Sequence, residues 1–518
     1  MLVCSNLQQS VEEQEETQQS TDWTAAAQLY PYLEEMPHFV TRAKANAQLQ
    51  VAASTADPER LQGKQRLIYD VVSSHVPAED PEPLRMIVSG TAGTGKSFLI
   101  HCLKTLFSDR LRVMAPTGVA AFNVGGFTMH SLLHLPTRGE FKALEGEQLQ
   151  QLQQSFSGVD YLFIDEISML GRKHFGQVDQ RLRQAFPHHA GKSLGGCSCL
   201  LVGDFGQLPP VMDLPLYSAV PRSAVANLGC ATYQSFAKAV MLTQVLRQDG
   251  QDREQVRFRE LLLCLRDGQV SVADWELLMT RCRSRVDSAA FADALHLHPT
   301  VQAVAEYNTA KLRNNGEPIA TIKAVHTGPN ANKASSEDAS GLQPVICLAH
   351  GVRVMLTSNL WTDAGLVNGA MGTVQAICYQ SGGPPSLPVA VMVKFDKYCG
   401  PALHDGSVPI VSQRRTWIQG GSACSRLQIP LKRAWAITIH KAQGLTLDKV
   451  VIDVGKKEFS AGLTFVACSR RVRCLIGIMF DPPFPDQRVT SLSRSMRLTE
   501  HKDEVARLCS MERAKFPS

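Results

Sequence analysis

One stretch, residues 86–100 (MIVSGTAGTGKSFLI), constrains the fold of this chain more than any other. An apolar strand pattern runs into a glycine-rich loop and then into the start of a helix. Three glycines allow a tight turn whose backbone N–H groups point inward, and the helix presents the positive end of its dipole there. The pattern predicts a phosphate-binding loop, in which Lys96 reaches the β- and γ-phosphates of a nucleotide and Ser97 binds Mg²⁺. The predicted nucleotide contacts are Gly90, Thr91, Ala92, Gly93, Thr94, Gly95, Lys96 and Ser97.

Length and composition exclude several classes of protein. A chain of 518 residues with 44% hydrophobic content is expected to form more than one globular domain. No apolar run reaches the roughly 18 residues of a membrane span, and the polar, acidic N-terminus resembles neither a secretory nor a mitochondrial targeting segment. The 14 cysteines are scattered singly, without the spacing of a disulfide framework. We expect a soluble intracellular protein with reduced cysteines and no membrane partner.

Charge is distributed unevenly along the chain. The net charge is +5, but the first sixty residues hold nine acidic and three basic side chains. The remaining chain has 50 basic against 39 acidic residues, an excess of 11. A basic body suits an anionic partner such as a nucleic acid, although basic solvated faces are common and composition alone is weak support.

Both ends of the chain are expected to lie outside the folded core. Residues 1–55 form a polar segment that is predicted to be partly disordered, since the Gln/Glu/Ser run at 8–20 lacks apolar periodicity. Residues 23–53 fit a loosely attached helical segment. Residues 485–518 are interpreted as a basic C-terminal tail.

Several further apolar stretches predict the strands of a parallel α/β sheet. Each is short and ends in small or polar residues, and helix patterns separate them. In such sheets, ligands bind beyond the carboxyl ends of the strands. The stretches are 111–117, 161–169, 199–210 and 240–243.

Three polar residues at the ends of these strands are candidates for nucleotide chemistry. Asp165 and Glu166 follow the apolar run 161–164, where Asp165 is predicted to bind Mg²⁺ and Glu166 to orient and deprotonate the attacking water. Gln207 follows the next run and can sense the γ-phosphate or hold that water. Adjacent acids after a strand are often only a cap or a turn, so the catalytic interpretation depends on the phosphate loop upstream.

Three more residues extend the predicted nucleotide site. Gln65 lies on the polar side of a helix pattern at 61–72, and its amide can pair with the N6/N7 edge of adenine. Arg247 follows the strand pattern at 240–243 and is a candidate γ-phosphate ligand, although a surface arginine fits equally well. Arg470, in a later helix pattern, would couple hydrolysis to closure of a cleft.

The second half of the chain repeats the α/β pattern and then changes character. A polar run at 327–341 is expected to be mobile. Alternating strands with a Gly-Gly-Pro-Pro turn between 368 and 425 predict a small inserted barrel. The other expected elements are a helix at 258–266, a strand at 294–297, a helix at 301–312 and a strand at 352–356.

Two polar sets lie where strands lead into helices. Thr117 ends the 111–117 strand and Gly118 follows it, and their hydroxyl and backbone N–H groups suit the phosphate oxygens of a nucleic acid. His440 belongs to the second set and is considered only as a member of it, because lone histidines are usually structural. The second set comprises Thr438, His440, Gln443, Gly444 and Thr446.

Taken in order, these motifs resemble the superfamily 1B helicases over residues 61–480, and within them the petite-integration-frequency (PIF-type) DNA helicase family. Where that family often has Ala-Leu-Ser-Arg, this chain has ACSR at 467–470, which keeps the arginine. The motifs are Gln65, 90–97, 115–121, 165–169, 203–210, Arg247, 440–444 and 469–470. The features that favour the PIF type over the RecD type are 128–130, 167–186, 365–369 and 434–440.

The resemblance implies an α/β fold with two RecA-like P-loop NTPase domains, a small 1B insertion and an SH3-like β-barrel insertion, 2B. ATP binds between the two RecA-like domains in this arrangement. The implied limits are 56–245 for domain 1A with 1B near 134–157, 246–371 and 426–484 for domain 2A, and 372–425 for 2B.

The resemblance also implies an activity. The chain is expected to be an ATP-dependent 5′-to-3′ DNA helicase that translocates on single-stranded DNA and unwinds duplex in replication, recombination, repair or telomere maintenance. ATP and Mg²⁺ are the implied cofactors, and single-stranded and forked duplex DNA the partners. The free protein is expected to be a monomer. Because members of the family act in the nucleus, a nuclear location is expected, and mitochondria are the alternative compartment.

Residue roles follow by position in the family's motifs. Lys96, Glu166, Gln207, Arg247 and Arg470 are the implied catalytic residues, the last three at the γ-phosphate. Ser97 and Asp165 hold the metal, and Gln65 and Gly444 join the loop 90–97 around the nucleotide. The implied DNA-facing residues are Thr117, Gly118, Thr128, His130, Thr438 and His440.

Three alternatives remain at this point. One is a single-strand translocase ATPase without processive unwinding, and another is a helicase of a mobile element such as a Helitron. A third, of a different class, is a nucleic-acid-binding scaffold descended from a helicase. Every residue expected for hydrolysis is present in the sequence, which disfavours the scaffold.

Overall fold

The computed structural model describes residues 21–46, 56–77, 81–136, 140–244, 253–469 and 475–516. The chain forms two compact units: unit 1 comprises Met1–Gln50 and Val301–Ile437, and unit 2 comprises Val51–Thr300 and Thr438–Ser518. The units do not follow the domain limits suggested by the sequence, because the span 246–371 falls in both. Those limits stay a prediction.

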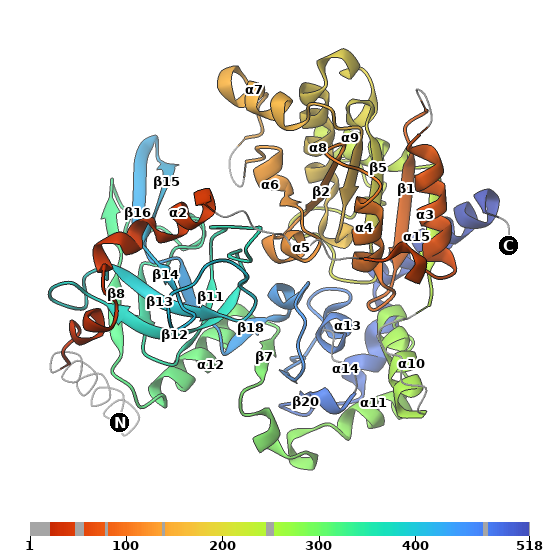
Figure 1. The fold of residues 1–518 in the computed structure, drawn as a ribbon. Coiled ribbons are helices and arrows are strands. Elements are labelled where there is room, and N and C mark those ends of the chain that lie inside the picture. The colour runs from red at the N-terminus through yellow and green to blue at the C-terminus, as the bar shows by residue number, and fades with distance from the viewer. Residues whose placement is uncertain are drawn as a thin grey trace. The chain divides into compact units, whose positions relative to one another are not determined.

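Unit 2 is built on a six-stranded parallel sheet in the order β3-β2-β4-β5-β1-β6 (Figure 1). β4 and β5 are buried at every position, as expected of central strands covered by helices on both faces. The five strands expected from apolar runs in this part of the chain, β1, β2, β4, β5 and β6, are confirmed, and β3 is an additional short strand. The strands are β1 (Arg85–Gly90), β2 (Leu111–Ala115), β3 (Phe127–Thr128), β4 (Tyr161–Ile164), β5 (Ser198–Gly203) and β6 (Lys238–Leu242).

Helices pack on both faces of this sheet because strand side chains alternate in direction. Met86 and Val88 lie in one hydrophobic cluster with Leu99, whereas Ile87 lies in a second cluster with Phe175. The sheet therefore separates two cores. The helices of this region are α3 (Lys64–His75), α4 (Lys96–Lys104), α5 (Gly118–Asn123), α6 (Met129–Leu132), α7 (Gly146–Ser155), α8 (Arg172–Ala185) and α9 (Ala224–Gln234).

A second parallel sheet in unit 2 places β19 (Val450–Ile452) between β7 (Leu295–His298) and β20 (Ile478–Phe480). β19 and β20 are short, wholly apolar and buried, as suits the interior of an α/β layer, whereas β7 alternates leucine and histidine. The strand expected at 294–297 and the helix expected at 258–266 are confirmed. The helices of this region are α10 (Arg253–Asp267), α11 (Val272–Met279), α13 (Leu463–Cys468) and α14 (Gln487–Thr490).

The C-terminal helix α15 (Met496–Lys515) packs along the edge strand β6. The sequence suggested only a basic tail here. Leu508 is fully buried in the core, and buried Glu504 accepts a hydrogen bond from the Tyr233 hydroxyl. Glu512 forms an ion pair of 2.8 Å with Lys64 of α3 and accepts a backbone N–H of β6. Residues 496–515 are therefore part of the folded core.

Unit 1 consists mainly of antiparallel strands, in sheets ordered β14-β13-β12-β11-β17, β15-β16-β9 and β10-β8. β11 was expected in a parallel α/β layer, but it pairs antiparallel with β12 and β17, so that expectation was wrong. The physical reason is that residues 357–370 contain no crossover helix, and a chain that turns straight back pairs antiparallel. The elements are α12 (Val301–Arg313), β8 (Ala320–Lys323), β9 (Val325–Thr327), β10 (Val345–Leu348), β11 (Arg353–Leu356), β12 (Met371–Cys378), β13 (Ala390–Phe395), β14 (Val408–Ile410), β15 (Gln413–Gln419), β16 (Ser422–Gln428), β17 (Leu431–Arg433) and β18 (Ala436–Thr438).

The polar run at 327–341 is anchored, contrary to the expectation that it is mobile. The fully buried guanidinium of Arg426 donates to the carbonyl oxygens of Ala331, Ala334 and Leu342 at 3.1, 2.7 and 2.9 Å. Charge-assisted hydrogen bonds of this kind satisfy carbonyls that lie outside any sheet or helix. One distant arginine therefore fixes a segment that has few apolar residues of its own.

The N-terminal segment is helical as expected, but it is not loosely attached. Tyr30, Leu33 and Met36 are buried against Met392 and neighbouring side chains of β12 and β13. The Tyr30 hydroxyl also donates to Asp405 at 2.7 Å. The run at 8–20, expected to be disordered, lies outside the described residues. The described helices of this segment are η1 (Ala25–Leu29), η2 (Leu33–His38) and α2 (Phe39–Asn46).

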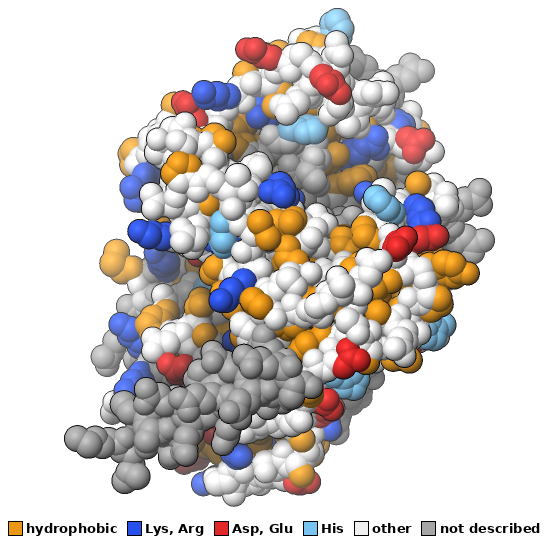
Figure 2. Space-filling view, turned by 90° about the vertical axis from the view of Figure 1, so that its left-hand side faces the viewer, with side chains coloured by type: hydrophobic (Ala, Val, Ile, Leu, Met, Phe, Trp, Pro, Cys, Tyr) orange, Lys and Arg blue, Asp and Glu red, His pale blue; other side chains and the backbone are white. Residues whose placement is uncertain are grey.

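The surface carries mixed side chains. Among the coloured residues of the face drawn in Figure 2, basic, acidic and hydrophobic groups are interspersed, with no continuous basic stripe. No helix within the described ranges is both long and apolar enough to cross a membrane.

Candidate functional site

The loop between β1 and α4 has the geometry of an anion cradle. Gly93 and Gly95 have φ values of 90° and 78°, a region that side chains disfavour. A Cβ on Gly90 would lie 2.7 Å from the Thr94 hydroxyl oxygen and 2.8 Å from Leu242, so this position also requires glycine. α4 begins at Lys96, directly after the loop. Backbone N–H groups and the helix N-terminus thus face the same space.

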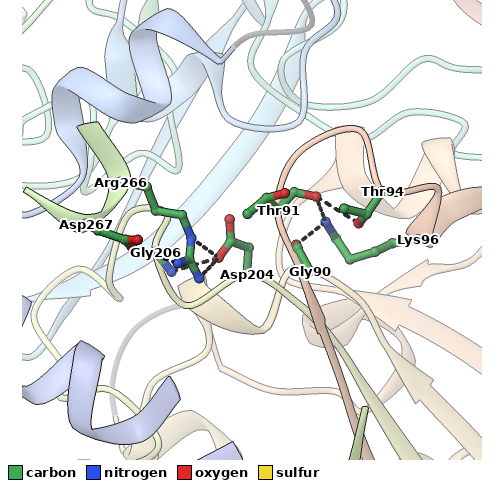
Figure 3. A network of polar contacts seen from close by, with 8 residues as sticks. All are labelled: Gly90, Thr91, Thr94, Lys96, Asp204, Gly206, Arg266 and Asp267. Atoms are coloured by element: carbon green, nitrogen blue, oxygen red, sulfur yellow. Dashed lines mark hydrogen bonds and ion pairs between the residues drawn. The ribbon is translucent and has the colours of Figure 1, made fainter. Parts of the chain in front are cut away.

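Lys96 lies inside this cradle. Its ammonium donates to the carbonyl oxygens of Gly90 at 2.7 Å and Thr91 at 2.9 Å, and Thr94 also donates to the Thr91 carbonyl at 2.9 Å (Figure 3). These acceptors are backbone carbonyls of the loop itself, so the ammonium stays within the cradle. The Lys96 ammonium is therefore held inside the loop whose geometry suits an anion.

The acidic pair at the end of β4 lines the same pocket as Lys96 and Ser97. Asp165 is 6% exposed, and with the Ser97 hydroxyl it offers the oxygen ligands that Mg²⁺ prefers. Glu166 has a left-handed backbone, with φ 54° and ψ 46°. That conformation costs a residue other than glycine about 1–3 kcal/mol, and such strain gathers at functional sites.

A buried ion pair supports the loop after β5. Asp204 is fully buried and accepts from both the Nε and the Nη2 of Arg266 at 3.1 and 2.9 Å, and from the Gly206 N–H at 3.0 Å (Figure 3). A Cβ on Gly206 would lie 2.5 Å from the Arg266 Nε, so glycine is required for this approach. The pair joins α10 to the loop that carries Gln207.

The residues around the cradle come from several distant parts of unit 2. Gln207 is 6% exposed and lines the pocket opposite the phosphate loop. Gly444, with φ 84°, accepts a hydrogen bond from the Asn123 amide at 3.0 Å, which fixes the 444 turn against α5. The pocket is lined by Ala92, Gly93, Gly95, Lys96, Ser97, Ala120, Asn123, Asp165, Glu166, Gln207, Gly444, Leu445 and Ser469.

Gln65 is buried beside the phosphate loop. It is 3% exposed, and its Nε2 donates to the Thr94 carbonyl at 2.8 Å. Its Oε1 is buried and has no hydrogen-bond partner among the described residues. A buried amide oxygen without a partner is costly, so a donor such as the N6 amino group of adenine would satisfy it.

We expect Gln65→Ala to raise the KM for ATP about 5- to 10-fold, the equivalent of one hydrogen bond, while kcat changes less than about twofold. The preference for ATP over GTP should fall by a similar factor, because the lost contact is to the base. Steady-state hydrolysis with both nucleotides measures this. Gln62→Ala, at an exposed neighbouring glutamine, is the matched control, and an unchanged ATP/GTP preference in Gln65→Ala would contradict the assignment.

A second, largely apolar pocket in unit 2 collects several of the residues expected to face DNA. Thr117, His130 and His440 line it, together with His174, which the sequence did not suggest. The rings of His130 and His174 meet edge to face at 5.7 Å. Burial lowers the pKa of all three histidines, and proximity to His174 adds to this for His130. These imidazoles are therefore neutral at pH 7, suited to stacking and hydrogen bonding.

The remaining predicted residues lie elsewhere. Thr128 is buried, and its hydroxyl accepts the Ser131 N–H at 3.3 Å to cap α6. Gly118 is the buried first residue of α5, and Thr438 precedes the turn Ile439–Ala442. None of the three is among the residues lining the second pocket, and their DNA contacts stay predictions. Arg247 and Arg470 lie outside the described residues.

Sequence reasoning missed three residues that the fold brings to these sites: Asn123, His174 and Arg266. Each lies on a helix, and the apolar periodicity of a helix sequence identifies only the residues that pack in the core, not the polar residues that contact a site. Asn123 ends α5 and is the polar residue of an otherwise apolar stretch, which is a faint signal at most. The pairing of Arg266 with Asp204 has no local signature, because the partners are 62 positions apart.

Comparison with known proteins agrees with this geometry. A family profile described as "PIF1-like helicase" matches residues 60–276. "ATP-dependent DNA helicase PIF1" of Rattus norvegicus is 31% identical over 439 residues, which is 81% of this chain and 64% of that protein. The Pif1 helicase of Candida albicans has a similar structure, with a TM-score of 0.66 and 25% identity over 86% of this chain and 99% of that one.

A Pif1 helicase from Bacteroides, solved "in complex with ADP-AlF3 and ssDNA", has a TM-score of 0.62 and 25% identity over 83% of this chain and 94% of that one. The chain spans 64% and 58% of the length of the rat and human PIF1 helicases, less than two thirds of each. The order of the motifs, the phosphate-loop geometry and these likenesses agree, and residues 60–276 of this chain match the PIF1-like helicase family.

Proposed function

We propose that this protein is an ATP-dependent DNA helicase. The observation that carries the proposal is that one loop serves both pockets: Gln207 lines the pocket of the phosphate loop, and Leu208 to Val211 line the histidine pocket directly after it. Gln207 and Leu208 are neighbours in the chain, so a movement of Gln207 around a bound nucleotide would be passed directly to the pocket that suits nucleic acid.

The nucleotide pocket supports hydrolysis of ATP with Mg²⁺. Lys96 and the loop N–H groups bind the phosphates, and Ser97 and Asp165 hold the metal, which neutralises charge on the phosphates when bound. Glu166 accepts the proton of the attacking water, and Gln207 orients that water or contacts the γ-phosphate. In this proposal Arg247 and Arg470 complete the site at the γ-phosphate.

The histidine pocket supports binding of single-stranded DNA. Neutral imidazoles and the prolines and methionines around them offer flat, apolar surfaces on which bases of any sequence can stack. Thr117 and His440 contribute hydroxyl and ring N–H groups for the backbone. Single-stranded and forked duplex DNA are the proposed partners of a protein that is a monomer when free.

Domain roles follow within the same proposal. The six-stranded sheet is the core of RecA-like domain 1A, and the β7–β19–β20 layer belongs to domain 2A. The segment near 134–157 is the 1B insertion, and 372–425 is the SH3-like 2B insertion. The related PIF1 helicases of rat and human come from eukaryotes, so action on nuclear or mitochondrial DNA fits the proposal. The narrower proposal is a nuclear role in replication, recombination, repair or telomere maintenance.

The polarity test uses two partial duplexes that differ only in carrying a 5′ or a 3′ single-stranded tail. We expect ATP-dependent strand separation with the 5′ tail and none with the 3′ tail. Glu166→Gln protein provides the blank. Separation only from the 3′ tail would contradict the proposed direction. DNA-stimulated hydrolysis without separation of either duplex would favour the translocase alternative.

A further inference from the structure

Gln443 belongs to the turn that follows β18 and η9 (Ile439–Ala442), and its side chain is 5% exposed. Its Nε2 lies 3.3 Å from the Glu166 Oε2, 3.1 Å from the Ser168 Oγ and 3.4 Å from the Gln207 Oε1. One amide group therefore contacts the proposed general base, the residue two positions after it, and the proposed γ-phosphate sensor. No motif-based role was assigned to this contact.

Chemistry fixes the orientation of this amide. A carboxylate can only accept hydrogen bonds, so the group that faces Glu166 must be the NH₂. The Oε1 is then turned away from the three acceptors, and it is buried without a hydrogen-bond partner among the described residues. An unsatisfied buried carbonyl of this kind costs about 1–3 kcal/mol, and a donor brought by a ligand would relieve that cost.

Gln443 also lines the histidine pocket, together with His440, His130 and Thr117. The same side chain thus borders the proposed DNA site and contacts two residues of the nucleotide pocket. Glu166 depends on such contacts for its conformation, since its left-handed backbone is unfavourable without support from its surroundings. A small movement of Gln443 would change the acceptors available to its NH₂ group and the orientation of the Glu166 carboxylate.

We propose that Gln443 is a positioning residue that couples occupancy of the histidine pocket by single-stranded DNA to the orientation of Glu166 and Gln207. With the pocket empty, its NH₂ group holds the Glu166 carboxylate. A strand in the pocket pulls on the Gln443 amide and releases that carboxylate toward the water it deprotonates. The inference rests on the proposed function and identifies where its two sites communicate.

The test is Gln443→Met, which keeps the length and packing of the side chain and removes the amide. We expect the ratio of DNA-stimulated to unstimulated ATP hydrolysis to fall at least tenfold. Affinity for single-stranded DNA without nucleotide should fall by no more than about tenfold, the equivalent of the one hydrogen bond that the amide can offer the strand. The matched control is Gln428→Met, which removes a fully buried amide, bonded to the Ile322 carbonyl, from unit 1. The control should keep the stimulation ratio of the unaltered protein.

A readout that does not depend on hydrolysis separates coupling from a damaged active site. Coupling between two ligands is reciprocal, so a non-hydrolysable ATP analogue should change the Kd for single-stranded DNA in the unaltered protein, and this effect should vanish in Gln443→Met. Ser168→Ala removes one of the three acceptors and should lower the stimulation ratio partially. Combined with Gln443→Met it should have no additional effect, because both changes interrupt the same contact.

Each outcome bears on the inference. Equal loss of hydrolysis with and without DNA, or an unchanged effect of the analogue on DNA affinity, would overturn it while leaving the helicase proposal intact. If Gln443→Met does not fold, Ser168→Ala decides by the same two readouts. If the unaltered protein hydrolyses ATP without any response to DNA, the proposed function and the inference both fail.

Discussion

Lys96→Ala protein should lose ATP turnover by about 10²- to 10³-fold, the typical loss when one charge-stabilising donor is removed from an active site. The ammonium of Lys96 is already held at the cradle by the carbonyls of Gly90 and Thr91, and the truncated side chain leaves nothing in its place. Binding of single-stranded DNA should change less than about threefold, because Lys96 does not line the histidine pocket. Phosphate release and fluorescence anisotropy measure the two quantities.

Lys104→Ala is the matched control for this experiment. Lys104 lies at the end of the same helix, α4, where it donates to the carbonyls of Val124 and Gly125. The Lys104→Ala substitution also removes a half-buried ammonium, but it leaves the contacts of the phosphate loop unchanged. Turnover in Lys96→Ala at the level of Lys104→Ala would show that the cradle does not bind the reacting phosphates.

Arg266→Met should lower the free energy of unfolding by about 3–5 kcal/mol, because it leaves the fully buried Asp204 carboxylate without its cationic partner. Asp204→Asn should cost less. The remaining Arg266 still pairs with Asp267 at 2.9 Å, and an amide at 204 can still accept the Gly206 N–H. Urea unfolding midpoints measure both changes.

The control is Arg283→Met, which breaks the exposed ion pair with Asp481 and should lower the free energy of unfolding by less than about 1 kcal/mol. Equal losses of stability from Arg266→Met and Arg283→Met would contradict the importance of burial for the Arg266–Asp204 pair.

The same pair predicts a dependence of stability on pH. Burial alone raises the pKa of Asp204, but the charges of Arg266 and Lys96 and the hydrogen bonds from Arg266 and Gly206 outweigh it and hold the pKa below its ordinary value of 3.8. A carboxylate with a lowered pKa in the folded state contributes stability that is complete above the unfolded pKa and is lost as the pH falls through the folded pKa. The contribution should therefore persist at neutral pH and fade below about pH 4, and Asp204→Asn protein should lack that component of the acid transition.

Local chemistry explains what could be predicted from the sequence. The glycines of the phosphate loop, the strand β1 before it and the acids after β4 lie within short stretches of chain, so their residue types and spacing can be recognised without knowledge of the tertiary structure. The parallel layer followed because apolar runs alternate with helix patterns. Gln65 was expected on the polar side of its helix pattern, whereas the structure buries it beside the loop, where its amide donates to the Thr94 carbonyl.

Other features could not be predicted because their causes are distant. β11 was assigned to a parallel layer from its apolar pattern, which is the same in a buried antiparallel strand; the turn back into β12 decided its pairing. The run at 327–341 was expected to be mobile from its polar composition, but Arg426 anchors the carbonyls of Ala331 and Ala334 from 95 and 92 positions away. The C-terminal helix α15 was expected to be a tail because most of its residues are charged or polar, and its few buried residues form no clear apolar pattern in the sequence.

The sequence by itself therefore determined the phosphate loop, the acidic pair, the alternating α/β pattern and the resemblance to the PIF-type helicases, because these depend on residues that are neighbours in the chain. Only the tertiary structure decided which distant side chains support that chemistry. Arg266 meets Asp204 across 62 positions, and Gln443 meets Glu166 across 277. Such contacts form when packing of whole elements brings buried polar groups together, where each group must find a partner, and no local pattern specifies which partner that is.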